Sequence, residues 1–299
     1  MRHIDGAPIR KLAAEVGLGI TQTYEHIKAE LKELPLSNFL TASLCSRFCG
    51  ILIVDAKYIK ARGYRKKIAF IWAIDYLTHD IVATLLAPSE NHLAYLKLFS
   101  ILKRCGYSLQ IAVADDHGAI YEALMRVYPK AHLQLCHVHY LENIRKLLRI
   151  RTEPDHLTFF LQLKKLVFDE HTDFERLRTV LQRLLKTFAV RDSLRQQILK
   201  EIYDRRERLF AYTKVTHCPK NTNLIELYNS HLNARIRSIK GFKSYTGALR
   251  WLNGYVIWRR TKKFTDCRGK FRHLNHHCSL ELTIKKQALW PDIIGLSND

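Results

Sequence analysis

The sequence predicts an α/β protein: a mixed β-sheet with helical segments before it, inserted into it and after it. Short apolar runs with strand character recur between residues 51 and 135, separated in places by amphipathic helical patterns. Residues 138–212 have helical periodicity and almost no turn residues, with Pro154 as the main break. Residues 8–33 form two further amphipathic segments around a Gly-Leu-Gly break.

We interpret residues 1–36 as a small helix-turn-helix, with Gly17-Leu18-Gly19 as the turn. The order of apolar residues and glycine resembles the motif of site-specific recombinases and repressors, in which the second helix reads DNA. The alternative is a purely structural helical hairpin, because residues 1–35 carry five basic and five acidic residues and Gly19 replaces the usual Ser or Thr cap. On the first interpretation, three residues of the second helix contact DNA: Thr21, Gln22 and Lys28.

Residues 37–50 are expected to be a linker, and the sheet region follows. The first strand, 51–55, is expected to end at the carboxylate of Asp55, and a later strand is followed by Asp115 and Asp116. The remaining strands are predicted at 67–75, 80–87, 110–114 and 131–135, with helices at 90–104 and 119–128.

We interpret residues 140–212 as an all-helical insertion; the alternative is a separate helical domain with different connectivity. The insertion splits the core into residues 51–139 and 213–262, and residues 263–299 form a basic tail containing His and Cys.

The core is expected to resume with a helix at 221–237 and to continue with another at 245–264. In the first of these, four apolar residues at i, i+3, i+4 and i+8 predict an inward face: Leu224, Leu227, Tyr228 and Leu232. Glu226 lies at the edge of this face.

The charge indicates a polyanionic partner, most simply DNA. The chain carries 49 Lys and Arg against 28 Asp and Glu, a formal net charge of +21. Residues 227–272 contain twelve of these cations and one acidic residue, interleaved with aromatic residues. We expect four cations there to contact phosphates: Arg235, Arg237, Lys240 and Lys243. The alternatives are a solvated basic face or a ribosome-associated protein.

The sequence shows no apolar run long enough to span a membrane and no signal-peptide pattern. Seven cysteines, an odd number at irregular spacing, argue against a disulfide framework. We therefore expect a cytoplasmic protein associated with the nucleoid.

Three carboxylates predict a metal centre. If strands 51–55 and 110–114 are neighbours, Asp55 and Asp115 project to the same edge of the sheet, where ligands of α/β proteins collect. With Glu226 they form a set suited to Mg²⁺ or Mn²⁺. Two such ions activate a water or a 3′-hydroxyl for phosphodiester chemistry. Asp116 is the alternative to Asp115, and Asp75, at the end of another strand, is expected to be structural.

Motifs in residues 51–260 resemble those of Mutator-type insertion-sequence transposases. They are Leu-Ile-Val-Asp55, Val-Ala-Asp115-Asp116-His-Gly-Ala-Ile-Tyr-Glu-Ala-Leu, Pro129-x-Ala-x-x-Gln134-x-Cys136-x-x-His139-x-x-x-Asn143 and Thr222-Asn223-x-x-Glu226-x-x-Asn229. The resemblance implies an RNase H-like fold, Asp-Asp-Glu catalysis and a helical insertion before the glutamate. It matches Asp115 to the family's second Asp, and it implies that Cys136 shapes the wall of the site while His139 approaches the scissile phosphate.

Zinc is the alternative ligand for the Cys and His residues. Cys136 and His139 have the spacing of half a zinc site, and His217-Cys218 could complete it. Cys267 and Cys278, with His273, His276 and His277 between them, form a second group. We expect neither group to bind zinc.

The function expected from these patterns is metal-dependent cleavage and strand transfer of DNA by a transposase. Its partners would be the terminal inverted repeats and target DNA, bound by a homo-oligomer because two ends must be paired. The alternatives are a catalytically silent DNA-binding regulator derived from such an enzyme, and an RNase H-like nuclease.

Overall fold

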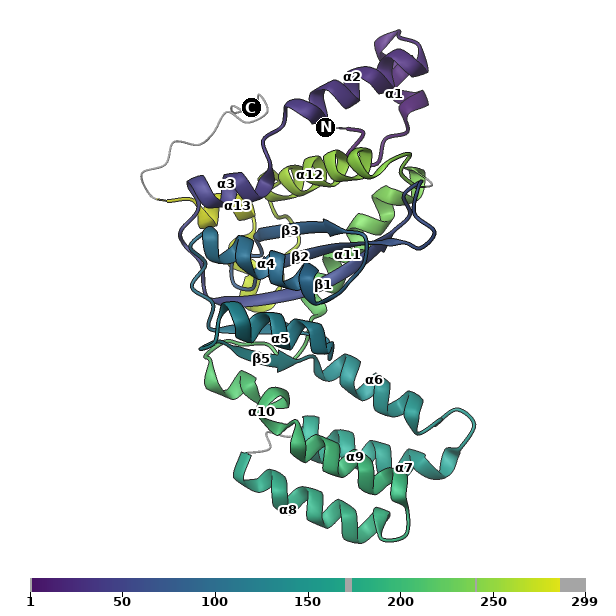
Figure 1. Ribbon diagram of the computed structural model, residues 1–299, viewed down its shortest axis with the longest axis vertical. Coiled ribbons are helices and arrows are strands. Elements are labelled where there is room, and N and C mark those ends of the chain that lie inside the picture. Colours follow the sequence, from purple (N-terminus) through teal and green to yellow (C-terminus); the bar gives the residue numbers. More distant parts are fainter. Residues whose placement is uncertain (1, 170–173, 240, 286–299) are drawn as a thin grey trace.

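The computed structural model describes residues 2–169, 174–239 and 241–285 of the 299-residue chain. Within these residues, a five-stranded mixed sheet has the order β3-β2-β1-β4-β5 (Figure 1). Strands β1, β4 and β5 are parallel, and β2 pairs antiparallel with both β1 and β3. The strands are β1 Ile51–Ile59, β2 Ile68–Asp75, β3 Ile81–Ala87, β4 Ile111–Ala114 and β5 His132–Leu135. The predicted α/β class with a mixed sheet is confirmed.

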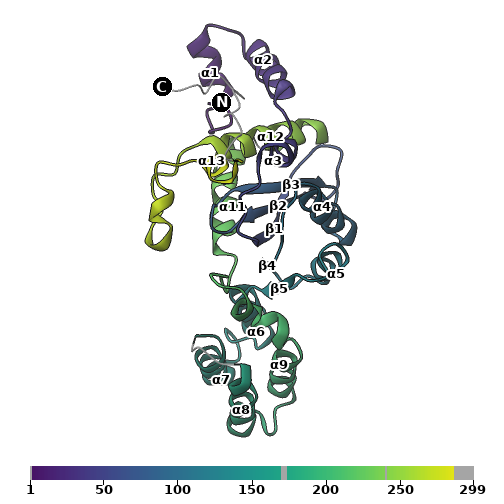
Figure 2. The same ribbon diagram turned by 90° about the vertical axis from the view of Figure 1, so that its left-hand side faces the viewer.

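Helices cover both faces of the sheet, which explains why its strands are nearly continuous apolar runs. Helices α4 and α5 lie on one face and α11 on the other (Figure 2). Along β1, Leu52 and Val54 belong to the core under α4 and α5, whereas Ile51 and Ile53 belong to the core under α11 and α12. Alternation therefore directs Asp55 to the α11 face. These helices are α4 His92–Arg104, α5 Gly118–Val127, α11 Asn223–Ile236 and α12 Tyr245–Thr261.

The expectation that the first strand ends at Asp55 was wrong. β1 continues to Ile59, and its pairing with β2 runs without interruption from Leu52↔Asp75 to Ile59↔Ile68. The carboxylate is tolerated inside the strand because it faces α11 and accepts a side-chain hydrogen bond from that helix. Asp115, in contrast, directly follows β4, as predicted.

Helix α11 packs with a face rotated from the predicted one. Ile225, Tyr228 and Leu232 are buried, but Leu227 is 54% exposed, so its placement on the inward face was wrong. The helix is oriented by Tyr228, whose hydroxyl donates to the carbonyl of His79 in the β2–β3 turn at 2.6 Å. An inward face at i, i+3 and i+7 satisfies the same helical period as the predicted one.

Two N-terminal helices form a hairpin beyond α12. Gly17 ends α1 in the left-handed conformation. The Gln22 side chain accepts from the Gly19 N–H at the start of α2, but glycine has no side-chain oxygen to cap the helix as a Ser or Thr would. Helix α2 packs on α12, where a Leu31 side chain lies over Gly254. The segment expected to be a linker contains a third helix, α3. The three are α1 Ile9–Val16, α2 Ile20–Glu33 and α3 Ser37–Leu44.

A helical insertion extends from the end of the sheet opposite to α1 and α2 (Figure 1). It begins directly after β5 and returns beside it, because the buried Gln134 amide donates to Leu209 O at 2.8 Å and accepts from the Tyr212 N–H at 2.8 Å. His137 Nε2 also donates to Leu209 O, at 2.6 Å. The helices are α6 His137–Leu147, α7 Leu157–Leu163, α8 Phe174–Leu184, α9 Ser193–Asp204 and α10 Arg206–Leu209.

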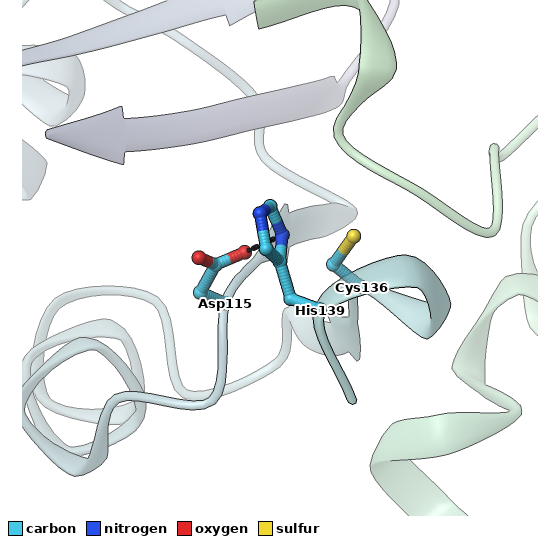
Figure 3. A group of neighbouring side chains, drawn as sticks. All are labelled: Asp115, Cys136 and His139. Carbon is cyan, nitrogen blue, oxygen red and sulfur yellow. Dashed lines mark ion pairs between the residues drawn. The ribbon is translucent and has the colours of Figure 1, made fainter. Parts of the chain in front are cut away.

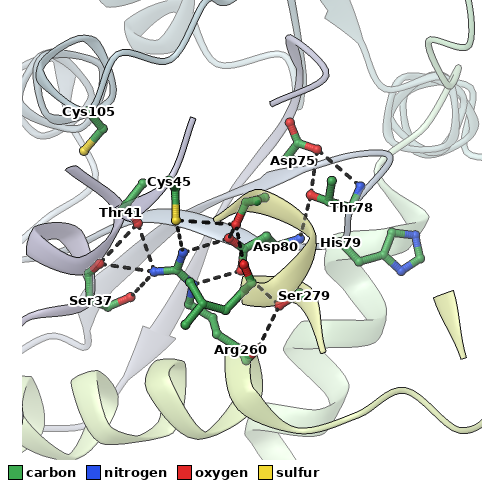
Figure 4. Close-up of polar contacts among 12 residues, drawn as sticks. Ser37, Thr41, Cys45, Asp75, Thr78, His79, Asp80, Cys105, Arg260 and Ser279 are labelled. Carbon is green, nitrogen blue, oxygen red and sulfur yellow. Dashed lines mark hydrogen bonds and ion pairs between the residues drawn. The ribbon is translucent and has the colours of Figure 1, made fainter. Parts of the chain in front are cut away.

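A fully buried ion pair joins distant segments of the chain (Figure 4). Arg260 of α12 donates to Asp80 through Nε at 2.9 Å and through Nη2 at 2.7 Å, and both side chains are 0% exposed. The remaining nitrogen, Nη1, donates to Ser37 O, Ser37 Oγ and Thr41 Oγ1 of α3. Ser279 and Thr283 of the short helix α13 (Ser279–Thr283) donate to the same carboxylate.

Asp75 has a structural role at the edge of the sheet where β1 begins. Its carboxylate accepts from the Thr78 hydroxyl at 2.8 Å, the Cys49 N–H at 2.9 Å and the Tyr107 hydroxyl at 2.8 Å. It thereby closes the β2–β3 turn, opposite Leu52 of β1. Among the helices of the described residues, none is long and apolar enough to cross a membrane.

Replacing Arg260 by Leu should destabilise the fold by ~3–5 kcal/mol, because Asp80 would remain as an unpaired buried charge. Equilibrium urea unfolding followed by circular dichroism measures this. Arg268→Leu, at an exposed position, is the matched control and should change stability by no more than ~0.5 kcal/mol. Equal effects of the two substitutions would contradict a structural role for the pair.

Candidate active site

Three carboxylates from separate elements meet on the α11 face of the sheet. Ile53 of β1 and Val113 of β4 are paired in register. Asp55 within β1 and Asp115 directly after β4, each two residues later, therefore come to the same part of the sheet. Glu226 approaches from the first turn of α11. Burial, with a smaller contribution from the charges of Asp115 and Glu226, raises the pKa of Asp55 to about 7, although hydrogen bonds from Ala56 and Asn229 act to lower it. The three predicted carboxylates are thus near enough to affect one another electrostatically.

His139, in the first turn of α6, lies between two of these carboxylates. Its Nδ1 is 2.5 Å from Asp115 Oδ1, as Figure 3 shows, and its Nε2 is 3.6 Å from Glu226 Oε1. Hydrogen bonds to Asp115 and to Cys136 raise the pKa of His139 to about 11. The ring is therefore an imidazolium at neutral pH and balances part of the negative charge.

Cys136 and Thr222 form the wall beside this histidine. The Cys136 thiol is buried and accepts from the Thr222 N–H at 3.4 Å and from the Thr222 hydroxyl at 3.2 Å. Burial acts to raise the pKa of Cys136, but hydrogen bonds from His139 and Thr222 outweigh it, and the net change is a lowering. The same hydroxyl lies 3.4 Å from His139 Nδ1, so Thr222 also fixes the ring.

One group of side chains has metal-ligand spacing. The ligand atoms of Asp115, Cys136 and His139 all lie within 4.8 Å of one another, and no other set of three or more such residues does so among the described residues (Figure 3). His217 and Cys218, the other half considered for a zinc site, do not belong to it. All seven cysteines lie in the described part of the chain, and all are free thiols.

The two consecutive aspartates point in different directions. Asp115 pairs with His139 and faces the other carboxylates, whereas Asp116 forms an ion pair with Arg205 at the end of α9. Asp116 therefore connects the sheet to the helical insertion.

Asn229 was missed as a site residue. Its Nδ2 donates to Asp55 Oδ2 at 2.6 Å, and its Oδ1 is buried without a hydrogen-bond partner among the described residues. The signal was present in the sequence, because Thr222, Glu226 and Asn229 follow the i, i+4, i+7 spacing of one helix face. Each of the three contacts a different part of the site.

The residues predicted to contact DNA from the second helix are at the surface. Thr21, Gln22 and Lys28 are exposed, although Gln22 caps the helix and Lys28 pairs with Glu25 at 3.0 Å.

The four cations predicted to contact DNA after Glu226 differ in their exposure and in their partners. Arg237 and Lys243 are exposed, and Lys243 Nζ lies 5.3 Å from the ring centroid of Tyr24 in α2. Arg235 is instead held in the protein, 3.0 Å from Asp5 and over the Trp258 ring. Lys240 lies outside the described residues.

The sequence is similar to known transposases over most of its length. Residues 13–264 match the family described as "Transposase, Mutator family". The chain is 22% identical over 268 residues to the transposase for insertion sequence element IS256 in transposon Tn4001 from Staphylococcus aureus, a match that covers 85% of this chain and 67% of the relative. It is 25% identical over 266 residues to the transposase for insertion sequence element ISRM5 from Rhizobium meliloti, which covers 85% and 65%. The chain spans about two thirds of the length of these relatives.

Asp55→Asn should stabilise the metal-free protein increasingly as pH rises from about 4 to about 7. In this interval the folded wild type keeps a proton that the unfolded chain has released, so wild-type stability falls with rising pH. The variant cannot ionise. Since one pKa unit corresponds to ~1.4 kcal/mol, the difference should approach at most ~4 kcal/mol at neutral pH.

Urea unfolding at a series of pH values, in the presence of a chelator, measures this difference. Asp266→Asn, at an exposed carboxylate, is the control and should parallel the wild type. An Asp55→Asn protein less stable than the wild type at neutral pH would show that the carboxylate is not penalised by burial.

Proposed function

The chain belongs to the Mutator family of transposases, and from this premise we propose that it cleaves and transfers DNA strands at the ends of an insertion sequence, using divalent cations. The observation that carries the proposal is the approach of Asp55, Asp115 and Glu226 to one another from β1, β4 and α11. A buried carboxylate beside two further carboxylates is costly to a fold unless a cation compensates it, and clustered acids with perturbed pKa values are typical of functional sites.

The topology supports an RNase H-like core. An antiparallel β1–β2–β3 unit continues through parallel β4 and β5, and the glutamate is supplied by a helix that packs on the sheet after the insertion. In this proposal residues 51–139 and 213–262 form the catalytic core, 140–212 the insertion and 1–36 a DNA-reading helix-turn-helix.

The residues fit Mg²⁺ or Mn²⁺. Carboxylate oxygens are the donors these hard cations prefer, and the buried Asn229 Oδ1, which lacks a partner among the described residues, adds a neutral oxygen beside Asp55. Asp55, Asp115 and Glu226 would hold the ions. Two bound ions would supply an activated water or 3′-hydroxyl and stabilise the leaving oxygen. The ion pair of Asp116 with Arg205 favours Asp115 as the ligand.

The protein's own groups prepare the site in three ways. Asn229 orients Asp55 through its 2.6 Å hydrogen bond, and Thr222 fixes the His139 ring. His139, as an imidazolium between Asp115 and Glu226, limits their mutual repulsion and offers a positive charge to a DNA phosphate. The buried thiol of Cys136 keeps water from the inner side of that ring.

DNA would bind across the exposed cations near the site, with terminal inverted repeats and target DNA as its two substrates. Pairing two ends requires a homo-oligomer in this scheme, and the protein would act at the nucleoid. The retained carboxylates argue against the alternative of a catalytically silent regulator.

Cleavage of a labelled duplex that carries the end of the element, taken from the DNA flanking its gene, tests the proposal. Glu226→Gln and Asp115→Asn should each slow Mg²⁺-dependent cleavage by ~10³-fold, since loss of a metal-held charge costs several kcal/mol in the transition state. A chelator should abolish cleavage by the wild type.

Asp116→Asn is the matched control, because it removes the adjacent carboxylate but leaves the cluster intact, and it should retain cleavage within about tenfold. If Asp116→Asn is inactive and Asp115→Asn is active, the assignment of the second ligand is reversed. Undiminished cleavage by Glu226→Gln would refute the proposal that Asp55, Asp115 and Glu226 form the catalytic trio.

A further inference from the structure

The loop between β1 and β2 is unusually basic. Five of its eight residues, 60–67, are Lys or Arg, and none is acidic. We call these residues the basic hairpin. Together with the segment between α11 and α12, it borders a surface hollow of about 410 Å³. The cations that line this hollow are Lys60, Arg62, Arg65, Lys66, Lys67 and Lys243.

The basic hairpin is held in place by the backbone. The Arg62 N–H donates to Phe242 O at 2.8 Å, and the Phe242 N–H donates to Lys60 O at 2.9 Å. The Phe242 side chain is 7% exposed and packs against Trp251 with ring centroids 5.6 Å apart. The cations are thus presented on a fixed support rather than on a free loop, which lowers the entropy lost when a ligand binds.

Within the described ranges, these cations form no ion pair with a carboxylate. All six cations are exposed, and none of them has an Asp or Glu oxygen within 4.0 Å among the described residues. By contrast, Lys28 and Arg145 each have an acidic partner on the surface. A concentrated positive potential of this kind attracts a polyanion.

The distance of the basic hairpin from Asp55 indicates how far from the carboxylate site it would contact a bound polyanion. β1 runs from Asp55 directly into Lys60, and at ~3.3 Å per strand residue the separation is on the order of 17 Å. The hollow also borders the α11–α12 connection, on the face of the sheet that carries the carboxylates. For B-form DNA that lies along β1, with an axial rise of ~3.4 Å per base pair, this distance corresponds to about five base pairs.

We propose that the basic hairpin grips the phosphate backbone of duplex DNA about five base pairs from the phosphate at the carboxylate site. This inference rests on the proposed function for the identity of the duplex. It assigns to residues 60–67 a role in setting where the DNA lies relative to the cut, independent of base sequence.

Neutralising the basic hairpin tests this grip. The variant Lys60→Gln, Arg65→Gln, Lys66→Gln, Lys67→Gln removes four charges. The matched control removes four exposed charges from the α4 and α5 face: Lys97→Gln, Arg104→Gln, Arg126→Gln, Lys130→Gln. Binding to a fluorescent duplex of about 40 base pairs is measured by anisotropy over a series of NaCl concentrations.

The slope of log K against log salt should become shallower by about 3 to 4 in the hairpin variant, at ~0.9 per lost phosphate contact, and by less than about 1 in the control. Replacing the three lysines by arginine should preserve the wild-type slope. Thermal unfolding of each variant shows whether it is folded. If the glutamine variant is not, the methylphosphonate measurement on the wild type, described next, retains the test.

A second measurement locates the contact. Duplexes with one defined 3′-hydroxyl end carry a single neutral methylphosphonate at successive positions. In the wild type, binding should weaken most when the neutral linkage is about five base pairs from that end, and the hairpin variant should not respond to it.

The outcomes separate this inference from the proposed function. If the wild type cleaves the element end but the hairpin and control variants have equal salt slopes, the basic hairpin is not a DNA contact and the proposed function stands. If the hairpin variant loses binding while Glu226→Gln cleaves as well as the wild type, the grip is supported and the catalytic trio is wrong. A wild type that neither binds nor cleaves DNA overturns both.

Discussion

The architecture depends on one buried ion pair, Arg260 with Asp80. A guanidinium and a carboxylate with 0% exposure are tolerated only when every polar atom is paired, and here α3, α12, α13 and the start of β3 supply the partners. The pair fixes α12 against the sheet. Helix α12 in turn supports α2 at one end and, through Trp251 and Phe242, the segment that anchors the basic hairpin. Two surfaces that would contact DNA, α2 and the basic hairpin, therefore share a single buried support.

At the carboxylate site, in contrast, buried polar groups are not fully compensated. Asp55 is buried inside a strand and lies near two other acids, so its pKa is raised to about 7. The amide oxygen of Asn229 has no partner among the described residues. Such groups lower the stability of the metal-free protein. The imidazolium of His139 offsets part of the negative charge of these carboxylates. In the proposed function, a cation bound by these carboxylates would offset the rest of this cost.

Local patterns were enough to predict the mixed sheet and the position of Asp115 directly after one of its strands. Buried parallel strands are continuous apolar runs, and Asp115 follows one directly. The end of β1 was missed because Lys57 and Tyr58 look like loop residues until their antiparallel partner on β2 is known. Leu227 and Ile225 satisfy the helical period equally well, and only the contact of Tyr228 with the β2–β3 turn decides between them. The partner of Arg260 is 180 residues away, a separation that no local pattern encodes.

The extension of β1 beyond Asp55 connects these observations. The same strand carries a carboxylate of the site and leads into the basic hairpin. The distance between the site of cleavage and the proposed phosphate contact would therefore be set by strand geometry rather than by a flexible linker. Pairing with β2 on one side and β4 on the other fixes the register of that strand. A slip of one residue would turn Asp55 toward α4 and α5 and would move the basic hairpin off its Phe242 anchor at the same time. The register of one central strand thus constrains both the chemistry and the placement of the DNA.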